Sequence, residues 1–345
     1  MPSTVIEQLQ TFGPENCQQF TYAQAARYTR KLCRTHYENF TVVSWFLPRR
    51  LREDFNHVYA FCRWADDLGD ETGDPQQSLQ LLQWWQHELQ LCYNDQPRHP
   101  VFVALHQTIR KHDIPQQPFA DLIDAFIQDQ QVNRYDHWDQ LLDYCTRSAN
   151  PVGRIVLYLC GHRDEQRQRL SDETCTALQL ANFWQDVRRD IIQRNRVYIP
   201  NDVARKHNLD LQMMVKAVRY DAWGSCENPG TGDRAEQAPQ GCGCANIPSP
   251  AIHALQPAAR ATVHELVQRT WPMFQRGRAL LPMLQPDVRL DVKLFTLGGE
   301  AILKLIRRQN YDTLTRRPRL GKLRKSSLIL RALVGKLCAV GGRKP

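Results

Sequence analysis

The sequence lacks long apolar runs and lacks alternating β-branched runs separated by hairpin turns. No uninterrupted apolar stretch approaches the roughly 18 to 20 residues that a membrane-spanning helix needs. The N-terminus also lacks the basic-then-apolar order of a signal peptide. Stretches rich in Leu, Ala, Gln, Arg and Glu recur instead between Pro and Gly residues, a pattern typical of helices. We therefore expect an all-α, cytoplasmic protein, whose 345 residues could form one large domain or two small ones.

Two further absences narrow the class of site. No Gly-x-Gly-x-x-Gly unit follows a strand pattern, so nothing indicates a dinucleotide-binding domain. The Glu-x-x-His pairs of a di-iron helical bundle are missing as well. The 11 cysteines are odd in number and follow no regular framework, which predicts reduced thiols rather than disulfides.

The net charge of +9 comes from the C-terminal tail. No acidic residue follows Asp312, whereas residues 316–345 carry repeated Lys and Arg interleaved with Leu. Such a tail suits peripheral contact with an anionic inner membrane surface through an amphipathic helix, and a solvated basic end explains it equally well. A nucleic-acid binder would leave the acidic clusters described below unexplained, so we expect no nucleic acid as partner.

Helical patterns recur between Pro and Gly residues over residues 15–315, which precede the basic tail. Residues 224–250 are dense in Gly, Pro, Ser, Asn and Cys and predict an inserted flexible loop; its cysteines could hold a soft metal but match no familiar zinc spacing. The expected helices cover about 21–38, 48–69, 75–93, 100–112, 116–131, 136–146, 149–161, 170–193, 202–219, 250–282 and 290–309.

Two acidic clusters are the chemically informative feature of the chain. Asp66 and Asp70 lie in one expected helix, and Asp186 and Asp190 lie in another. Each pair has i, i+4 spacing, so both carboxylates of a pair share one helical face and repel each other. Two such helices facing each other would form a cage for Mg²⁺, which takes oxygen ligands and completes its shell with substrate phosphates. The sequence therefore predicts a magnesium-diphosphate site.

The neighbours of these aspartates favour a cavity over a solvated surface. At about 100° per residue, Tyr59 and Arg63 share the stripe of the first pair, and Gln179 and Asn182 share that of the second. A solvated face would more often mix Lys, Glu and Ser. The opposite side of the second helix is apolar and should pack: it carries Leu180, Phe183, Trp184, Val187 and Ile191.

Two arginines follow the second cluster within one turn of its end. Arg194 and Arg196 could cover a bound diphosphate as a flap. They could equally form local ion pairs with Asp186 and Asp190. The sequence leaves both interpretations open.

Three segments resemble the signature segments of the squalene and phytoene synthase family: Cys62 to Asp70, Gln179 to Asp190, and Arg196 to Pro200. The resemblance extends from His36 to Asp312 and implies a single-domain isoprenoid synthase fold with helices around a central cavity. It implies that Asp66, Asp70, Asn182, Asp186 and Asp190 hold Mg²⁺, with Arg63 assisting catalysis. It further implies that the diphosphate and metal shell are surrounded by His36, Asn39, Tyr59, Arg63, Gln179, Asn182, Gln185, Arg196, Tyr198 and Tyr311.

The chain departs from the family pattern at three positions. Asn39 stands where many members have Ser, and Gln185 stands where a basic residue is common. Thr146 replaces a cavity tyrosine that the family links to the condensation of two prenyl diphosphates. A site with the metal cage but without that phenol should retain ionisation of a diphosphate and be poor at condensation.

The resemblance is closest to the hydroxysqualene synthase group of bacterial hopanoid pathways, in which water captures the cation formed from presqualene diphosphate. It implies a prenyl diphosphate substrate, handed over from a presqualene diphosphate synthase, and a product passed to a squalene-forming oxidoreductase. A complete squalene or phytoene synthase acting on farnesyl diphosphate is the alternative enzyme. A non-catalytic, synthase-like partner is the alternative from another class, and the intact acidic clusters disfavour it.

Overall fold

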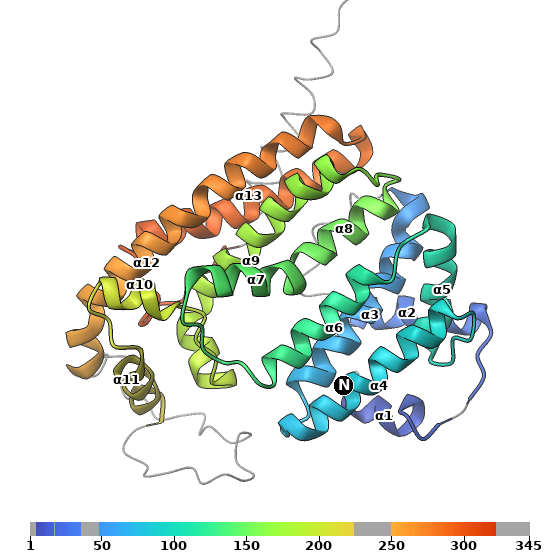
Figure 1. The fold of residues 1–345 in the computed structure, drawn as a ribbon, viewed down its shortest axis with the longest axis horizontal. Helices are drawn as coiled ribbons and strands as arrows, with labels where there is room; N and C mark the ends of the chain where they lie inside the picture. The colour runs from blue at the N-terminus through green and yellow to red at the C-terminus, as the bar shows by residue number, and fades with distance from the viewer. Residues whose placement is uncertain (1–4, 17, 36–47, 224–249, 322–345) are drawn as a thin grey trace, which may run out of the picture.

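A computed structural model of the chain describes residues 5–16, 18–35, 48–223 and 250–321, and these are helical apart from short connections and one isolated β-bridge (Figure 1). The all-α prediction is confirmed. The helices are α1 (Val5–Phe12), α2 (Tyr22–Thr35), the 3-10 turn η1 (Arg49–Leu51), α3 (Arg52–Asp70), α4 (Pro75–Tyr93), α5 (Pro100–His112), α6 (Gln117–Asp129), α7 (Trp138–Ser148), α8 (Asn150–Leu159), α9 (Glu165–Arg194), α10 (Asn201–Lys206), α11 (Leu211–Trp223), α12 (Pro250–Gly277), the 3-10 turn η2 (Arg278–Met283) and α13 (Pro286–Arg308).

The predicted helix over 202–219 is wrong as a single element. The chain breaks it into α10 and α11, because Asn208 adopts a left-handed conformation with φ of 56°. Asp210 then caps the new helix, since its Oδ1 accepts hydrogen bonds from the backbone N–H groups of Gln212 and Met213. The helix α1 was not predicted. The expected helix over 250–282 ends as an α-helix at Gly277 and continues as η2.

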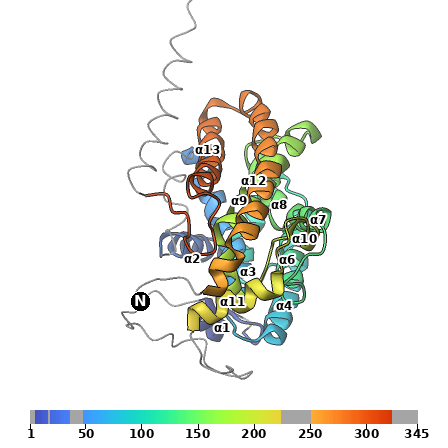
Figure 2. The same cartoon turned by 90° about the vertical axis from the view of Figure 1, so that its left-hand side faces the viewer.

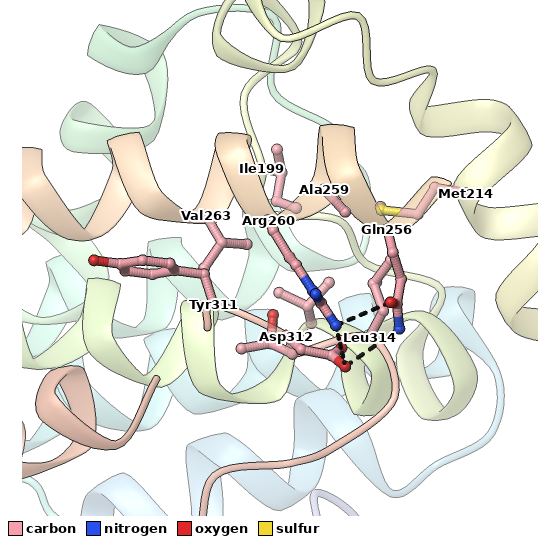
Figure 3. Close-up of a pocket in the computed structure, with 11 residues that line it drawn as sticks. Ile199, Met214, Gln256, Ala259, Arg260, Val263, Tyr311, Asp312 and Leu314 are labelled. Atoms are coloured by element: carbon pink, nitrogen blue, oxygen red, sulfur yellow. Dashed lines mark hydrogen bonds and ion pairs between the residues drawn. The ribbon is translucent and has the colours of Figure 1, made fainter. Parts of the chain in front are cut away.

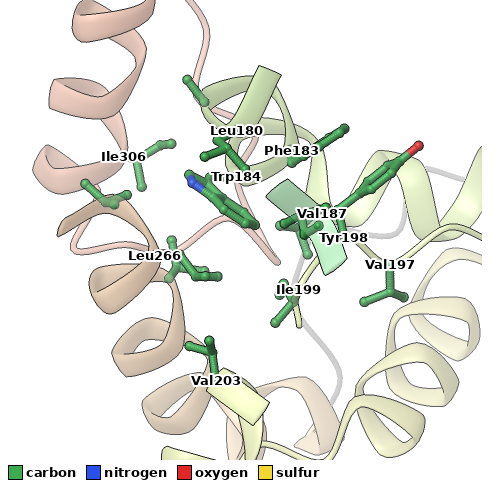
Figure 4. Close-up of a cluster of buried hydrophobic side chains, with 14 of the residues drawn as sticks. Leu180, Phe183, Trp184, Val187, Val197, Tyr198, Ile199, Val203, Leu266 and Ile306 are labelled. Atoms are coloured by element: carbon green, nitrogen blue, oxygen red, sulfur yellow. The ribbon is translucent and has the colours of Figure 1, made fainter. Parts of the chain in front are cut away.

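The described residues form two large hydrophobic cores and a smaller cluster around Leu157 and Leu280. The N-terminal core lies among α2 to α6 and contains closely packed aromatic rings, with Trp64 stacked on Trp85 at 5.4 Å between ring centroids. The C-terminal core surrounds α9 and includes Phe183, Trp184 and Tyr198 (Figure 4). The helix α3 belongs to the first core and α9 to the second, so each acidic cluster is held by a separately packed helix.

The 30-residue helix α9 is the centre of the C-terminal half, with α12 and α13 running alongside it in both views (Figures 1 and 2). It starts at Asp164, whose carboxylate accepts the backbone N–H of Arg167. The side predicted to be apolar is buried, which confirms that prediction, and Trp184 donates its indole N–H to Thr270 on α12. This packing fixes the rotation of α9 and turns its amide and carboxylate residues away from the core.

The predicted loop and tail fall largely outside the described residues, which exclude 224–249 and 322–345. None of the helices in the described ranges is both long enough and apolar enough to cross a bilayer. The membrane contact expected of the basic tail stays a prediction.

The junction between α9 and the end of α12 requires glycine. A Cβ on Gly277 would lie 2.1 Å from the hydroxyl oxygen of Thr174 and 3.1 Å from its backbone nitrogen. We expect Gly277→Ala to lower the free energy of unfolding by about 1 to 3 kcal/mol through overpacking.

The matched control is Gly298→Ala within α13, where a Cβ meets no atom within 4 Å. Alanine there should stabilise the helix by roughly 0.5 to 1 kcal/mol. Thermal or denaturant unfolding of the two variants measures this difference. Equal effects of the same sign would contradict the packing described for α9 and α12.

Candidate functional site

The first acidic cluster lies in the last turns of α3, where Arg63 supplies the local cation. Its guanidinium binds Asp67 through Nε at 2.8 Å and Nη2 at 2.5 Å, and reaches Glu71 at 3.1 Å. The nearest nitrogen lies 3.8 Å from Asp66. The main partner of Arg63 is therefore the buried Asp67. This residue was not part of the helical stripe that the sequence predicted around Asp66 and Asp70. The signal for this pair was its own i, i+4 spacing.

Asp66 and Asp70 are not close partners of Arg63 and differ in their exposure. The side chain of Asp66 is 43% exposed and that of Asp70 is 13% exposed. Burial, followed by the neighbouring Asp70 carboxylate, raises the pKa of Asp66. The two like charges are thus held one turn apart, as the sequence predicted.

The second cluster is more deeply placed on α9. The side chain of Asp190 is 9% exposed and that of Asp186 is 16% exposed. Burial and repulsion from Asp186 raise the pKa of Asp190 to about 7, although Arg194, Arg189 and Arg196 oppose the shift. The nearby arginines therefore do not fully offset the negative charge that this helix carries.

Arg194 joins the two clusters. Its Nη2 lies 2.8 Å from an Asp70 oxygen on α3, and its Nη1 lies 3.9 Å from an Asp190 oxygen on α9. One guanidinium thus spans carboxylates from two helices that belong to different cores. The predicted opposition of the acidic helices is present at these two residues.

The turn after α9 sets this geometry. Asn195 takes the left-handed conformation with φ of 52°, which asparagine tolerates, and reverses the chain. Arg134 holds the turn by donating hydrogen bonds to the backbone oxygen and the side-chain oxygen of Asn195. Arg194 and Arg196, on either side of Asn195, consequently both reach Asp70. Local ion pairing of these arginines is therefore present, directed mainly across to α3.

Arg196 is buried and lies between two carboxylates. It contacts Asp70 at 3.0 Å and Asp129 of α6 at 3.4 Å. Burial raises the pKa of Asp129 to about 6, and Tyr144 of α7 donates its hydroxyl hydrogen to this carboxylate. Asp129 and Tyr144 were not among the predicted site residues, because their link to Asp70 runs through Arg196 and leaves no local pattern in the sequence.

The other predicted residues have different surroundings. Tyr59 is half-buried one turn before Arg63, and burial raises the pKa of its phenol to about 12, so it stays protonated. Gln179 is half-buried and Asn182 is exposed on α9. Gln185 donates its side-chain N–H to the carbonyl of Pro318 at 2.6 Å.

Four predicted site residues either pack their rings against other rings or lie outside the described residues. Tyr198 is buried in the core, with its ring stacked on Phe183 at 3.7 Å between centroids. Tyr311 packs its ring against His264 of α12 at 4.6 Å. His36 and Asn39 lie outside the described residues. Thr146 is exposed on α7, and its hydroxyl donates to the carbonyl of Asp143.

The donor set fits a hard divalent cation in its chemistry. The described residues contain no preformed group of three or more carboxylate, imidazole or thiolate side chains, because arginines contact the aspartates instead. Carboxylate oxygens are the ligands that Mg²⁺ prefers. Burial, followed by the neighbouring carboxylate of the same pair, raises the pKa values of Asp66 and Asp190, and a bound cation would lower both.

Asp190 should destabilise the metal-free protein at neutral and alkaline pH. Its folded-state pKa is raised, so folding retains a proton that the unfolded chain releases, and stability falls as pH rises from about 4 towards 7. We expect Asp190→Asn to raise the melting temperature in EDTA at about pH 8, with a smaller gain at about pH 5.

The exposed Asp139 of α7 supplies the control, since Asp139→Asn should leave the melting temperature nearly unchanged at both pH values. Loss of stability in Asp190→Asn at the higher pH would mean that the arginine contacts outweigh the burial of this charge.

Comparison with known proteins indicates the family of the chain. The model of the squalene/phytoene synthase family matches residues 33–225 and 244–324. A hydroxysqualene synthase of Zymomonas mobilis is 36% identical over 170 residues, which cover 48% of this chain and 56% of the relative. That of Rhodopseudomonas palustris is 37% identical over 187 residues, which cover 52% and 63%. The match thus spans less than two thirds of the length of these relatives.

Two solved structures have the same overall arrangement. The squalene synthase HpnC from Alicyclobacillus acidocaldarius superposes with a TM-score of 0.69 and 37% identity over 84% of this chain and 95% of that one. A dehydrosqualene synthase in complex with ligand gives a TM-score of 0.71 at 19% identity, over 92% and 98% of the two chains, which supports the fold alone. Together with the family match over most of its length, these findings mean that the chain belongs to the squalene/phytoene synthase family.

Proposed function

We propose that this protein ionises presqualene diphosphate with the aid of Mg²⁺ and lets water capture the resulting cation, which yields hydroxysqualene and diphosphate. The single observation that carries the proposal is the contact of Arg194 with Asp70 and Asp190, which brings the two acidic clusters to one place. Sequence identities of 36 and 37% to two hydroxysqualene synthases support the choice of reaction within the family.

The four aspartates of the two clusters would hold the metal, and Mg²⁺ bound there supplies positive charge that makes the departure of diphosphate feasible. The residues concerned are Asp66, Asp70, Asp186 and Asp190. Asn182, one turn before Asp186 and exposed, offers a further oxygen on the same face of α9.

The chain's own cations have distinct tasks in this proposal. Arg196 is locked between Asp70 and Asp129, so it positions the Asp70 carboxylate. Arg194 is 39% exposed and lies closer to Asp70 than to Asp190, so it can turn towards an incoming diphosphate when the metal takes over these carboxylates. Arg63 stays paired with Asp67 and keeps positive charge beside Asp66.

The bond changes are those of substitution by water. The carbon–oxygen bond to diphosphate breaks and its electron pair leaves with the diphosphate oxygen. The carbocation rearranges, a water oxygen forms the new carbon–oxygen bond, and that oxygen loses one proton. No hydride donor is consumed, so the reaction needs no nicotinamide.

Condensation of two prenyl diphosphates is the step that we propose the chain performs poorly. The family's cavity tyrosine is replaced by Thr146, whose hydroxyl is already bonded to the backbone one turn earlier. A threonine so placed has neither the acidity nor the reach of a phenol. Phytoene synthases also match 84 to 88% of the chain, at 24 to 28% identity. A complete synthase is therefore the alternative function.

Turnover of presqualene diphosphate should depend on both acidic clusters. With Mg²⁺, the unaltered protein should release hydroxysqualene and diphosphate without NADPH, and EDTA should stop the reaction reversibly. We expect Asp66→Asn and Asp186→Asn each to lower kcat by at least about a hundredfold, because each removes a carboxylate that would hold the Mg²⁺ whose positive charge stabilises the departing diphosphate.

Asp139→Asn on α7 serves as the control for the loss of one surface charge and should keep full activity. Activity that survives in the double variant of Asp66 and Asp186, or that is indifferent to EDTA, would refute the proposed function and favour a non-catalytic role.

Farnesyl diphosphate offered alone should be a poor substrate. We expect product formation from farnesyl diphosphate and Mg²⁺ to be at least about a hundredfold slower than turnover of presqualene diphosphate, because the condensing phenol is missing. Mass spectrometry of the organic extract measures both reactions.

Abundant presqualene diphosphate from farnesyl diphosphate would overturn the role assigned to Thr146 and identify a complete synthase. Squalene formed only in the presence of NADPH would move the chain to the reductive reaction.

A further inference from the structure

The segment that follows α13 lies across the acidic face of α9. We call residues 313–321 the strap. Arg188 of α9 donates to the carbonyl of Leu314 at 3.4 Å, and Gln185 donates to that of Pro318 at 2.6 Å. Between these two points Arg317 meets Asp186. The strap therefore follows α9 past a predicted metal ligand.

The start of the strap is fixed by Asp312, which is buried. Its Oδ2 accepts hydrogen bonds from Gln256 at 3.2 Å and Arg260 at 3.4 Å, both on α12 (Figure 3). Thr315 donates its backbone N–H and its hydroxyl to the same carboxylate. The hollow around these residues leaves no room for a water molecule, so it serves as an anchor for the strap rather than as a ligand site.

Arg317 makes a two-point ion pair with Asp186. Its Nε donates to one carboxylate oxygen, and its Nη2 donates to the other at 2.9 Å. The side chains are 35% and 16% exposed, respectively. Because both oxygens of Asp186 are engaged, a metal ion can bind this carboxylate fully only when the guanidinium gives way.

We propose that Arg317 is a further residue of the diphosphate site: it holds Asp186 while no metal is bound, and exchanges that carboxylate for the diphosphate when the metal arrives. This inference rests on the proposed function, since it requires a metal and a diphosphate at the aspartates.

The physical basis is a competition between two cations for one carboxylate. Only molecules in which the ion pair between Arg317 and Asp186 is broken can bind the metal fully. The apparent affinity for metal therefore falls as the fraction of molecules with this ion pair rises. The released guanidinium stays within reach of the site, because Asp312, Leu314 and Pro318 hold the strap on both sides of it. A planar guanidinium binds phosphate oxygens in the same two-point manner as it binds a carboxylate.

The strap supplies its own control. Arg316 precedes Arg317 and is exposed, and none of the described hydrogen bonds or ion pairs joins it to α9. Arg316→Gln therefore removes the same charge from the same segment without removing the contact with Asp186. Arg317→Gln is expected to fold, because the side chain is partly solvated.

The test is calorimetric titration of the full chain, first with MgCl₂ alone and then with inorganic diphosphate at saturating Mg²⁺. We expect Arg317→Gln to bind Mg²⁺ about fivefold more tightly than the unaltered protein, since the competing ion pair is gone. It should bind diphosphate about tenfold more weakly, since one two-point contact is lost. Arg316→Gln should stay within about twofold of the unaltered protein in both titrations.

Two results would overturn the inference. If Arg317→Gln binds Mg²⁺ no better than the unaltered protein, Arg317 does not compete with the metal for Asp186. If Arg316→Gln shifts both affinities as much, Arg317 acts only through general charge. In either case the proposed function stands. If none of the three proteins binds Mg²⁺, the metal site itself is wrong and both proposals fall together.

Discussion

The structure depends on the cost of holding four carboxylates on two facing helices. Asp66 and Asp70 repel each other on α3, as do Asp186 and Asp190 on α9, and partial burial strengthens that repulsion. Arginines from several elements offset the charge in the metal-free protein. Arg194 lies between the helices, and Arg317 holds Asp186 from the C-terminal side. The pKa values of Asp66 and Asp190 stay raised beside these arginines, first through burial and then through the neighbouring carboxylate.

The scaffold holds the two acidic helices by packing each of them in a separate core. α3 is held by the aromatic core of the N-terminal half, and α9 by the core that contains Trp184 and Phe183. The link between them is ionic and runs through the Asn195 turn. Such a link can exchange partners without disturbing either core, because charged groups at a partly solvated boundary lose little when water and metal replace one another.

Sequence reasoning predicted the parts of the site that follow from helical periodicity. It placed each aspartate pair on one face and the apolar residues of α9 in the core. It missed what depends on tertiary contact: the pairing of Arg63 with Asp67 rather than Asp66, the support of Arg196 by Asp129, and the strap over α9. It also missed the break at Asn208, because a left-handed turn inside a helical pattern carries only a weak local signal.

The central claim is that the two aspartate pairs together bind metal and diphosphate. Anomalous diffraction from crystals grown with Mn²⁺ and inorganic diphosphate tests it most directly, because Mn²⁺ takes the oxygen ligands of Mg²⁺ and is visible by its scattering. The account predicts metal peaks between α3 and α9, at about 2.1 Å from carboxylate oxygens of both helices, with Arg317 turned from Asp186 to the diphosphate. Metal bound elsewhere, or an Asp70–Arg194–Asp190 bridge unchanged beside bound diphosphate, would contradict it.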